Sequence, residues 1–235
     1  MTMNFIWNST TIKWYQDANA YSGFFKNIAD LIVPRLEGYS TLCDIGCGLG
    51  LVDLEFGKNI ESITCIDNDK EAIKSLKKSI DDRKITNIES HLMSSDNING
   101  SWDIIYISFF GSHNMERFLP FCKKLIAVVD KKKESKPYIE QYRSFHRNTV
   151  EKVEHNLNSK GIPYLLTEAS FEFGQPLVSI EEAKNFIRNN YHEVNDEDLN
   201  RFLSQRLIET NEREYPFYIQ KMKSVGIFEI EGNCI

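Results

Sequence analysis

The sequence predicts an α/β fold in which helices cover both faces of a mostly parallel β-sheet. In the first 130 residues, short apolar segments alternate with amphipathic ones, and strands that alternate with helices form parallel sheets through right-handed crossovers. The second observation is a group of glycines, Gly46, Gly48 and Gly50, directly after an apolar segment. The chain has only 12 glycines in 235 residues, so three within five positions indicate a special backbone turn.

The elements before the glycines are a helix and a short strand. Apolar residues recur at spacings of three and four through residues 21–32, which predicts one buried helix face. Pro34 and Gly38 then interrupt the pattern. The apolar segment 40–45 predicts a buried strand that leads straight into the glycines.

After the glycines, strands and helices alternate. The helix expected at 70–80 would turn Ala72, Ile73, Leu76 and Ile80 inward. A second helix is expected around 114–122. The predicted strands are 61–68, 87–93, 101–110 and 124–130.

The remainder of the chain is dominated by predicted helices, at 138–160, 179–191 and 196–210. Ser179 with Glu182 forms a capping-box pattern, and Asn195 is placed to cap the last of these helices. Two strands, 163–174 and 224–232, interrupt the helices. We therefore predict a single domain, 1–235, with an N-terminal helical segment at 1–38 and a helix-rich substrate cap at 138–215, inserted before the last strand.

Composition limits the possible functions. A net charge of −6 argues against an extended basic face for nucleic acid. The sequence lacks an apolar run of about 18 residues, which a membrane span needs, and its start lacks the layout of a secretory signal. The five cysteines are sparse and form no C-x-x-C pair. These features predict a cytoplasmic protein, and they leave its oligomeric state open.

A strand that ends in a glycine turn brings backbone N–H groups to the carboxyl edge of a sheet, which is a ligand site. Gly46 and Gly48 would let the backbone approach a ligand closely, and Gly50 would let the next helix start close to the sheet. The third glycine comes one residue too early for a dinucleotide fingerprint, and no Lys-Ser/Thr follows for a phosphate loop.

With Asp44 ahead of the glycines, Asp67 closing the second strand, and the strand Trp102-Asp-Ile-Ile-Tyr-Ile, the chain resembles class I S-adenosylmethionine-dependent methyltransferases over about residues 21–130. The resemblance implies a Rossmann-like three-layer sandwich with a seven-stranded sheet. It also implies S-adenosylmethionine as the cofactor.

The resemblance assigns roles to single residues. Asp44 and the glycine turn would hold the aminoacyl end of the cofactor, and Asp67 would accept hydrogen bonds from the ribose hydroxyls, unless it is only an exposed turn acid. Where many relatives carry an acid near the adenine, this chain has Met93 and Ser94, whose alternative role is a plain strand-end turn. Ser108 ends the fourth strand at the same pocket.

Methyl transfer is an in-line displacement that depends mainly on positioning. His113 is the candidate general base, the alternative being a capping or solvated histidine. No metal site is expected, and the proline-rich motif of amino-group methylases is absent after the fourth strand. We therefore expect a methyltransferase for a small-molecule acceptor, with its pocket built by the N-terminal helix and the inserted helices. The alternatives are a protein or RNA nucleophile, and a non-catalytic cofactor-binding scaffold.

Overall fold

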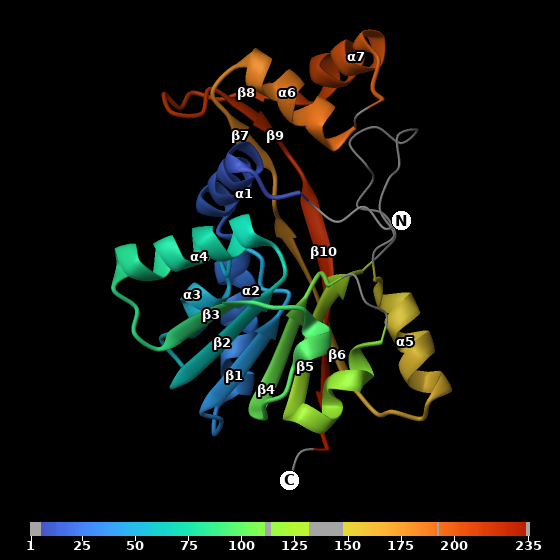
Figure 1. The fold of residues 1–235 in the computed structure, drawn as a ribbon. Coiled ribbons are helices and arrows are strands. Elements are labelled where there is room, and N and C mark those ends of the chain that lie inside the picture. The colour runs from blue at the N-terminus through green and yellow to red at the C-terminus, as the bar shows by residue number, and fades with distance from the viewer. Residues whose placement is uncertain (1–5, 111–113, 132–147, 192, 234–235) are drawn as a thin grey trace.

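A computed structural model describes residues 6–110, 114–131, 148–191 and 193–233, and its main element is a seven-stranded sheet (Figure 1). The strands lie in the order β3-β2-β1-β4-β5-β10-β6. Within this sheet, β10 runs in the direction opposite to the other six strands. The α/β prediction with a mostly parallel sheet is therefore confirmed. The strands are β1 (Thr41–Ile45), β2 (Ser62–Asp67), β3 (Ile88–Leu92), β4 (Trp102–Ser108), β5 (Cys122–Asp130), β6 (Leu165–Glu172) and β10 (Met222–Glu231).

Strand register aligns the residues that matter for the site. In the centre of the sheet, Asp44 of β1 lies opposite Cys65 of β2 and opposite Tyr106 of β4. Residues that face each other on neighbouring strands project from the same face of a sheet. The three side chains therefore form one row, which lies just before the carboxyl edge where the glycine turn begins.

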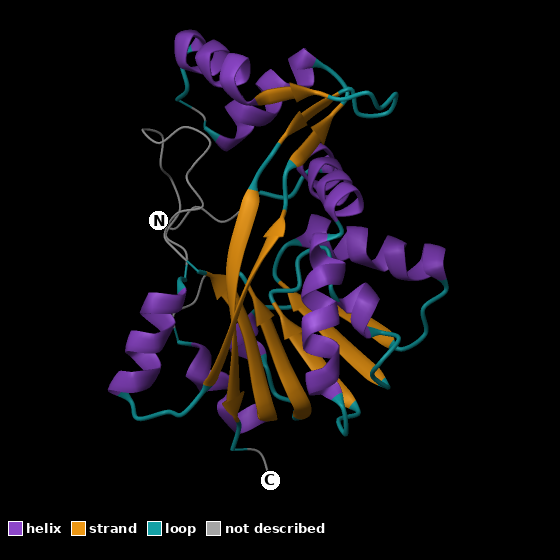
Figure 2. Ribbon diagram, turned by 180° about the vertical axis from the view of Figure 1, so that it is seen from behind, coloured by secondary structure: helices purple, strands orange, loops and turns teal. Residues whose placement is uncertain are grey.

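Helices cover both faces of the sheet (Figure 2). One face packs against α2 (Phe24–Ile32), α3 (Asp53–Phe56) and α4 (Lys70–Arg83). The other packs against the 3₁₀-helix η3 (Met115–Phe121) and α5 (Val150–Ser159). The four residues expected to face inward on α4 are all buried. The shorter 3₁₀ segments are η1 (Val33–Leu36) and η2 (Ser95–Asn97).

Two predicted helices differ from the structure. The segment 114–122 forms a 3₁₀-helix and not an α-helix, because Pro120 removes a backbone donor within it. The helix expected at 138–160 is described only from Val150 onward, and residues 132–147 lie outside the described part of the chain. That helix, α5, buries Val153 and Leu157 against the sheet. It therefore connects β5 to β6 as part of the sandwich and not as part of a cap.

Residues 175–219 form a small unit that we call the inserted module, seen at the top of Figure 1. It contains α6 (Ile180–Asn190), α7 (Asp196–Arg206) and a three-stranded antiparallel sheet. The expected caps of both helices are present, at Ser179 and Asn195. For the helix expected at 196–210, the predicted end was wrong: the helix stops at Arg206, and the next three residues form a strand. The strands of this sheet are β7 (Gln175–Leu177), β8 (Leu207–Glu209) and β9 (Phe217–Ile219).

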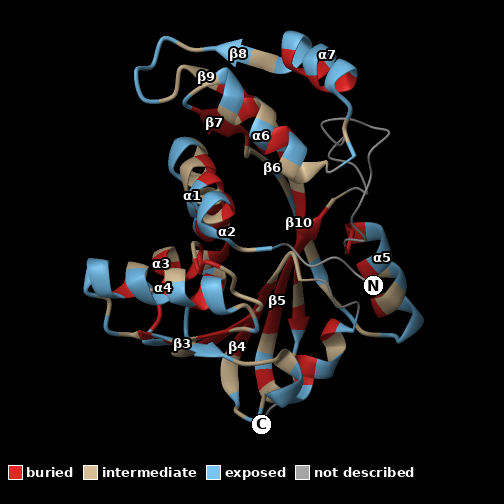
Figure 3. Ribbon diagram, turned by 45° about the horizontal axis from the view of Figure 1, so that its top comes forward, coloured by how far each residue is buried: buried red, intermediate tan, exposed pale blue. Residues whose placement is uncertain are grey.

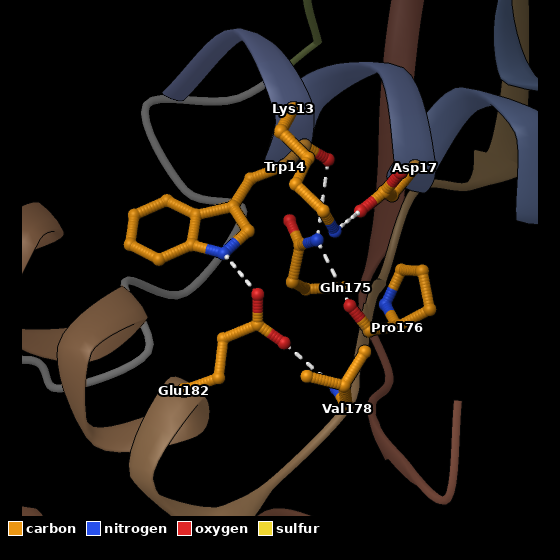
Figure 4. Close-up of polar contacts among 7 residues, drawn as sticks. All are labelled: Lys13, Trp14, Asp17, Gln175, Pro176, Val178 and Glu182. Atoms are coloured by element: carbon orange, nitrogen blue, oxygen red, sulfur yellow. Dashed lines mark hydrogen bonds and ion pairs between the residues drawn. The ribbon is translucent and has the colours of Figure 1, made fainter. Parts of the chain in front are cut away.

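Helix α1 (Ser9–Ser22) joins the inserted module to the rest of the chain (Figure 4). The Trp14 indole is buried in the apolar core of the module, and its Nε1 donates to Glu182 Oε1 at 3.1 Å. Gln175 Nε2 donates to the backbone oxygen of Trp14 at 3.2 Å. The other oxygen of Glu182 accepts from Val178 N. In the expected capping box this carboxylate would accept from Ser179 N, so its acceptor contact is shifted by one residue toward the N-terminus.

Buried residues follow the central strands and continue into the helices packed on them (Figure 3). Among the described residues, no helix has the length and apolar character needed to cross a membrane.

Candidate active site

The glycine turn has the backbone conformation that the sequence predicts. Gly46, Gly48 and Gly50 have φ angles of +79°, +54° and +62°, which side chains rarely tolerate. The amides of Gly46 and Cys47 donate to the oxygen of Ile66 on β2 at 2.7 and 3.1 Å. A Cβ on Gly50 would lie 2.5 Å from Leu76 of α4. The last glycine therefore permits close helix packing, and the first two shape the turn.

Asp67 is tied directly to this turn. Its Oδ2 accepts from Gly48 N at 2.8 Å, and its Oδ1 accepts from Asp69 N at 2.8 Å. Burial raises the pKa of Asp67, and these two backbone donors act in the opposite direction. Each carboxylate oxygen retains a second lone pair. The side chain can therefore fix the turn and still accept two further hydrogen bonds from a ligand.

The remaining residues singled out from the sequence lie around the same edge. Met93 N donates to the backbone oxygen of Asp67 at 2.8 Å, so the two residues are neighbours. Ser94 Oγ accepts from Asp96 N at 3.3 Å and caps η2, which makes it part of the turn after β3. Ser108 ends β4. His113 lies outside the described residues.

Sequence reasoning singled out Asp44 but missed its neighbour Asp53. Both side chains are fully buried, Asp44 on β1 and Asp53 at the start of α3. Within the described part of the chain, none of their four carboxylate oxygens has a donor in hydrogen-bonding geometry, although the Cys65 thiol and the Asp53 backbone amide are near enough to act on the pKa of Asp53 and lower it. Burial is the largest cause raising the pKa of each, and the charge of Asp53 raises that of Asp44 further. The available signal was an acid enclosed by Val52 and Leu54 in an apolar stretch.

A row of aromatic side chains, which we call the aromatic wall, begins at the glycine turn. Its members are Trp7, Tyr15, Phe24, Phe109 and Phe173. Trp7 Cζ2 lies 3.3 Å from where a Cβ on Gly48 would stand. The ring centroids of Trp7 and Tyr15 are 5.1 Å apart, and those of Tyr15 and Phe173 are 5.3 Å apart. Phe24 is 4.5 Å from Phe173, which continues the wall toward Phe109.

The far end of the wall carries a buried charge pair. Lys223 is 8% exposed, and its Nζ lies 3.2 Å from the centroid of the Phe109 ring and 3.8 Å from Asp130 Oδ1. Phe109 has a φ of +51°, an unusual conformation for a bulky residue. Backbone strain of this kind is concentrated at functional sites. Phe109, the residue after Ser108, thus combines a strained backbone with a ring that contacts Lys223.

Comparison with known proteins agrees with this geometry. Residues 24–106 match the family model of the methyltransferase small domain. The matched segment contains α2, the glycine turn, Asp67 and most of β4. No curated protein matches the chain in sequence.

Solved structures extend the likeness to nearly the whole chain. YcgJ from Bacillus subtilis has a TM-score of 0.56 at 13% identity, over 87% of this chain and 98% of its own. Magnesium protoporphyrin IX methyltransferase (ChlM) from Synechocystis PCC 6803, with bound S-adenosylhomocysteine, has a TM-score of 0.54 at 10% identity, over 96% and 89%. The [4+2]-cyclase SpnF has a TM-score of 0.54 at 14% identity, over 89% and 85%.

The chain has the class I S-adenosylmethionine-dependent methyltransferase fold. The family model over residues 24–106 and the fold both agree with the resemblance to methyltransferases whose cofactor is S-adenosylmethionine. The residues present fit this cofactor. A turn with three glycines stands beside a carboxylate with two open lone pairs, and two buried acids without a hydrogen-bond partner flank this turn, which is expected to bind a cationic group.

Proposed function

We propose that this protein transfers the methyl group of S-adenosylmethionine to a small-molecule acceptor in the cytoplasm. The observation that carries the proposal is the aromatic wall. It starts on the glycine turn at Trp7 and ends at the buried pair of Lys223 and Asp130. Small-molecule sites are mostly apolar enclosures with a few polar groups that fix orientation. The wall and its terminal charge pair have this composition.

The wall is built from segments far apart in the sequence. Trp7 and Tyr15 belong to the N-terminal region, Phe24 to α2, Phe109 follows β4, and Phe173 follows β6. Five rings from four parts of the chain converge on the carboxyl edge of the sheet, where ligands bind in open α/β folds. Phe24 is fully buried and supports the other four rings, which are half-buried. The acceptor that suits these four rings has an apolar or aromatic face.

In this proposal the cofactor supplies the methyl group, and the residues of the chain bind and orient. The glycine turn holds the aminoacyl end, and Asp67 accepts from the ribose hydroxyls. Met93 and Ser94 lie beside the adenine, and Ser108 lies near the reacting centre. The aromatic wall positions the acceptor for in-line attack. A base is needed only where the acceptor loses a proton, and His113 is the candidate for that role.

We also propose that the inserted module acts as the substrate cap. This narrows the cap expected at 138–215 to residues 175–219, because α5 packs on the sheet. Support comes from α1. The helix is anchored in the module through Trp14, and Tyr15 on the same helix belongs to the aromatic wall. Movement of the module would therefore be transmitted to the acceptor side of the site.

A second candidate is a cofactor-binding protein that does not transfer methyl groups. The observation that favours it is the match to SpnF, a [4+2]-cyclase with the same fold. A protein or RNA nucleophile is the other alternative. The net charge of −6 does not favour RNA, because nucleic-acid affinity rests largely on basic contacts to phosphate.

Release of S-adenosylhomocysteine during incubation with S-adenosylmethionine and a panel of aromatic acids, phenols and amines tests the proposal. We expect turnover with at least one small acceptor. Phe173→Ala should raise KM for this acceptor and leave cofactor affinity unchanged. As a matched control, Phe121→Ala removes another half-buried ring, from the opposite face of the sheet and not from the wall. Methyl transfer only to RNA or protein, or cofactor binding without any transfer, would contradict the proposal.

A further inference from the structure

We propose that Asp44 and Asp53 hold one proton between them beneath the glycine turn, and that this proton leaves when the cationic aminoacyl end of the cofactor binds. The inference rests on the proposed function, since it assigns a task to this acid pair in cofactor binding. It makes cofactor affinity dependent on pH.

The geometry that carries the inference is a row of side chains on one face of the sheet. Asp44 stands between Tyr106 and Cys65 in the strand register. The short helix α3 lies over this face, and Asp53 is its first residue. Both carboxyl groups are 0% exposed. Buried acids normally receive hydrogen bonds or ion pairs, so two of them without either are unusual.

The surroundings offer no positive charge. The groups that face the pair are the thiols of Cys47 and Cys65, the hydroxyl of Tyr106 and the carboxylate of Asp67. Burial raises the pKa of Cys65 and of Tyr106, so both stay neutral. No lysine, arginine or histidine faces the pair from the described residues.

Two adjacent buried carboxylates cannot both stay ionised without a cation. A proton shared between them resolves the conflict, because one carboxyl then donates to the other. The proximity of the two groups raises the pKa of Asp44 and acts to lower that of Asp53, as expected if one carboxyl keeps the proton and the other accepts from it. The two groups therefore titrate as a pair.

The pair lies where a cation would arrive. Asp44 is two residues before Gly46, and Asp53 is three residues after Gly50, so the glycine turn connects the two acids. S-adenosylmethionine carries an α-ammonium at its aminoacyl end, which the turn is proposed to hold. A nearby positive charge favours the ionised form of a carboxyl group. Binding would thus replace the shared proton by the ammonium group.

The direction of the pH dependence follows from linkage. The free protein binds one proton more than the complex, so cofactor affinity rises as pH rises. The rise is at most about tenfold per pH unit while the free pair remains protonated. The affinity becomes flat once the free pair has lost its proton.

Isothermal titration calorimetry of the whole chain with S-adenosylmethionine, and separately with S-adenosylhomocysteine, measures this proton. At one pH, in phosphate and in Tris buffer, the difference in apparent binding heat divided by the difference in buffer ionisation heat gives the number of protons released. We expect release of up to about one proton with either ligand, since both carry the ammonium.

Asp53→Asn is the decisive variant, because an amide can donate to Asp44 but has no proton to lose. We expect binding without the extra proton release and with little pH dependence. Protons that the ligand itself gains or loses contribute equally to the parent protein and to the variant, so they cancel in the difference between the two. Asp198→Asn, at another buried acid in the inserted module, should behave like the parent protein. Asp53→Asn should also raise Tm at alkaline pH by a few degrees, because burying an ionisable pair destabilises the fold there.

The outcomes separate the inference from the proposed function. Cofactor binding with equal heats in both buffers and no pH dependence would overturn the shared-proton inference and leave the proposed function intact. Proton release that persists in Asp53→Asn would also overturn it. Failure of the folded parent protein to bind either ligand would overturn both.

Discussion

Asp67 is the single side chain on which the proposed cofactor site depends most. It holds the glycine turn through Gly48 N and faces the ligand edge with two open lone pairs. We expect Asp67→Ala to weaken S-adenosylmethionine binding by about 1.5–3 kcal/mol, roughly 10- to 150-fold, the range for hydrogen bonds to a charged group. Asp69→Ala is the matched control, because it removes the side chain that caps α4 and keeps the backbone N–H that donates to Asp67. Equal dissociation constants for Asp67→Ala and the parent protein would show that the acid serves the fold alone.

Gly48 tests the turn itself. We expect Gly48→Ala to reduce cofactor affinity, because a Cβ would enter the space beside Trp7 at a φ of +54°. Gly161→Ala introduces the same strain at a φ of +66° in open space far from the turn. Both variants should lose about 1 kcal/mol of stability or somewhat more. Calorimetry should show a binding defect in Gly48→Ala only, and a similar defect in both would assign the effect to strain.

Asp103 lies near the start of β4, at the edge of the sheet opposite the glycine turn. We expect it to contribute to the stability of the fold and not to ligand binding. It accepts from Ser40 N and Thr41 N at 2.9 Å each and pairs with Lys123 at 2.8 Å. The hydrogen bond from Lys123 is the largest cause that lowers its pKa to about 2. A depressed pKa gives stability that is present above the unfolded value of 3.8 and is lost as pH falls toward 2.

Asp103→Ala should therefore lower the free energy of unfolding by about 1–3 kcal/mol at neutral pH. The difference from the parent protein should shrink between about pH 4 and 2. Urea titrations at several pH values measure both quantities. A difference that stays constant down to pH 2 would show that packing, and not the charge, accounts for the loss.

At the scale of elements, the inserted module is expected to be the least stable part of the fold. Its strands are three residues long, and it has an apolar core separate from the two cores of the sandwich. Such units open locally at low free energy. Hydrogen exchange should be faster in α6 and α7 than in β1 and β4, and should slow when cofactor and acceptor are both bound. Exchange as slow as in the sheet, with no response to ligands, would make the module a structural appendage.

The contact between α1 and the module can be loosened by a single substitution. Trp14→Phe removes the donor to Glu182 Oε1 and keeps an aromatic ring in the core. We expect faster exchange in α6 and unchanged exchange in β1. Lys13→Ala, on the exposed side of the same helix, is the control. Unchanged protection in α6 would show that this hydrogen bond does not hold the module.

Helices and strands could be predicted from the sequence where the local pattern of apolar residues determines them. The helix α4 has its apolar residues at regular spacing, and β1, β2 and β4 are short, mostly apolar segments before turn residues. The small sheet of the module was missed because three-residue strands are too short to show alternation. At the site, the glycines and Asp67 carry a local signal. Asp53 and the aromatic wall were missed because their proximity arises only through packing of distant segments.

At the scale of the whole molecule, the proposed function divides the structure into a cofactor half and an acceptor half. The glycine turn, Asp67, Met93 and Ser94 lie on β1 to β3 and their loops. The aromatic wall and Lys223 come from the N-terminal helices and from the ends of β4, β6 and β10. The central claim is that the first half is built for S-adenosylmethionine and not for a dinucleotide.

Calorimetric titration of the protein with S-adenosylmethionine, S-adenosylhomocysteine and NAD tests that claim most directly. The account predicts saturable binding of the first two ligands, weakened in Asp67→Ala, and no measurable binding of NAD. Tight binding of NAD, with no response to S-adenosylmethionine or S-adenosylhomocysteine, would contradict it.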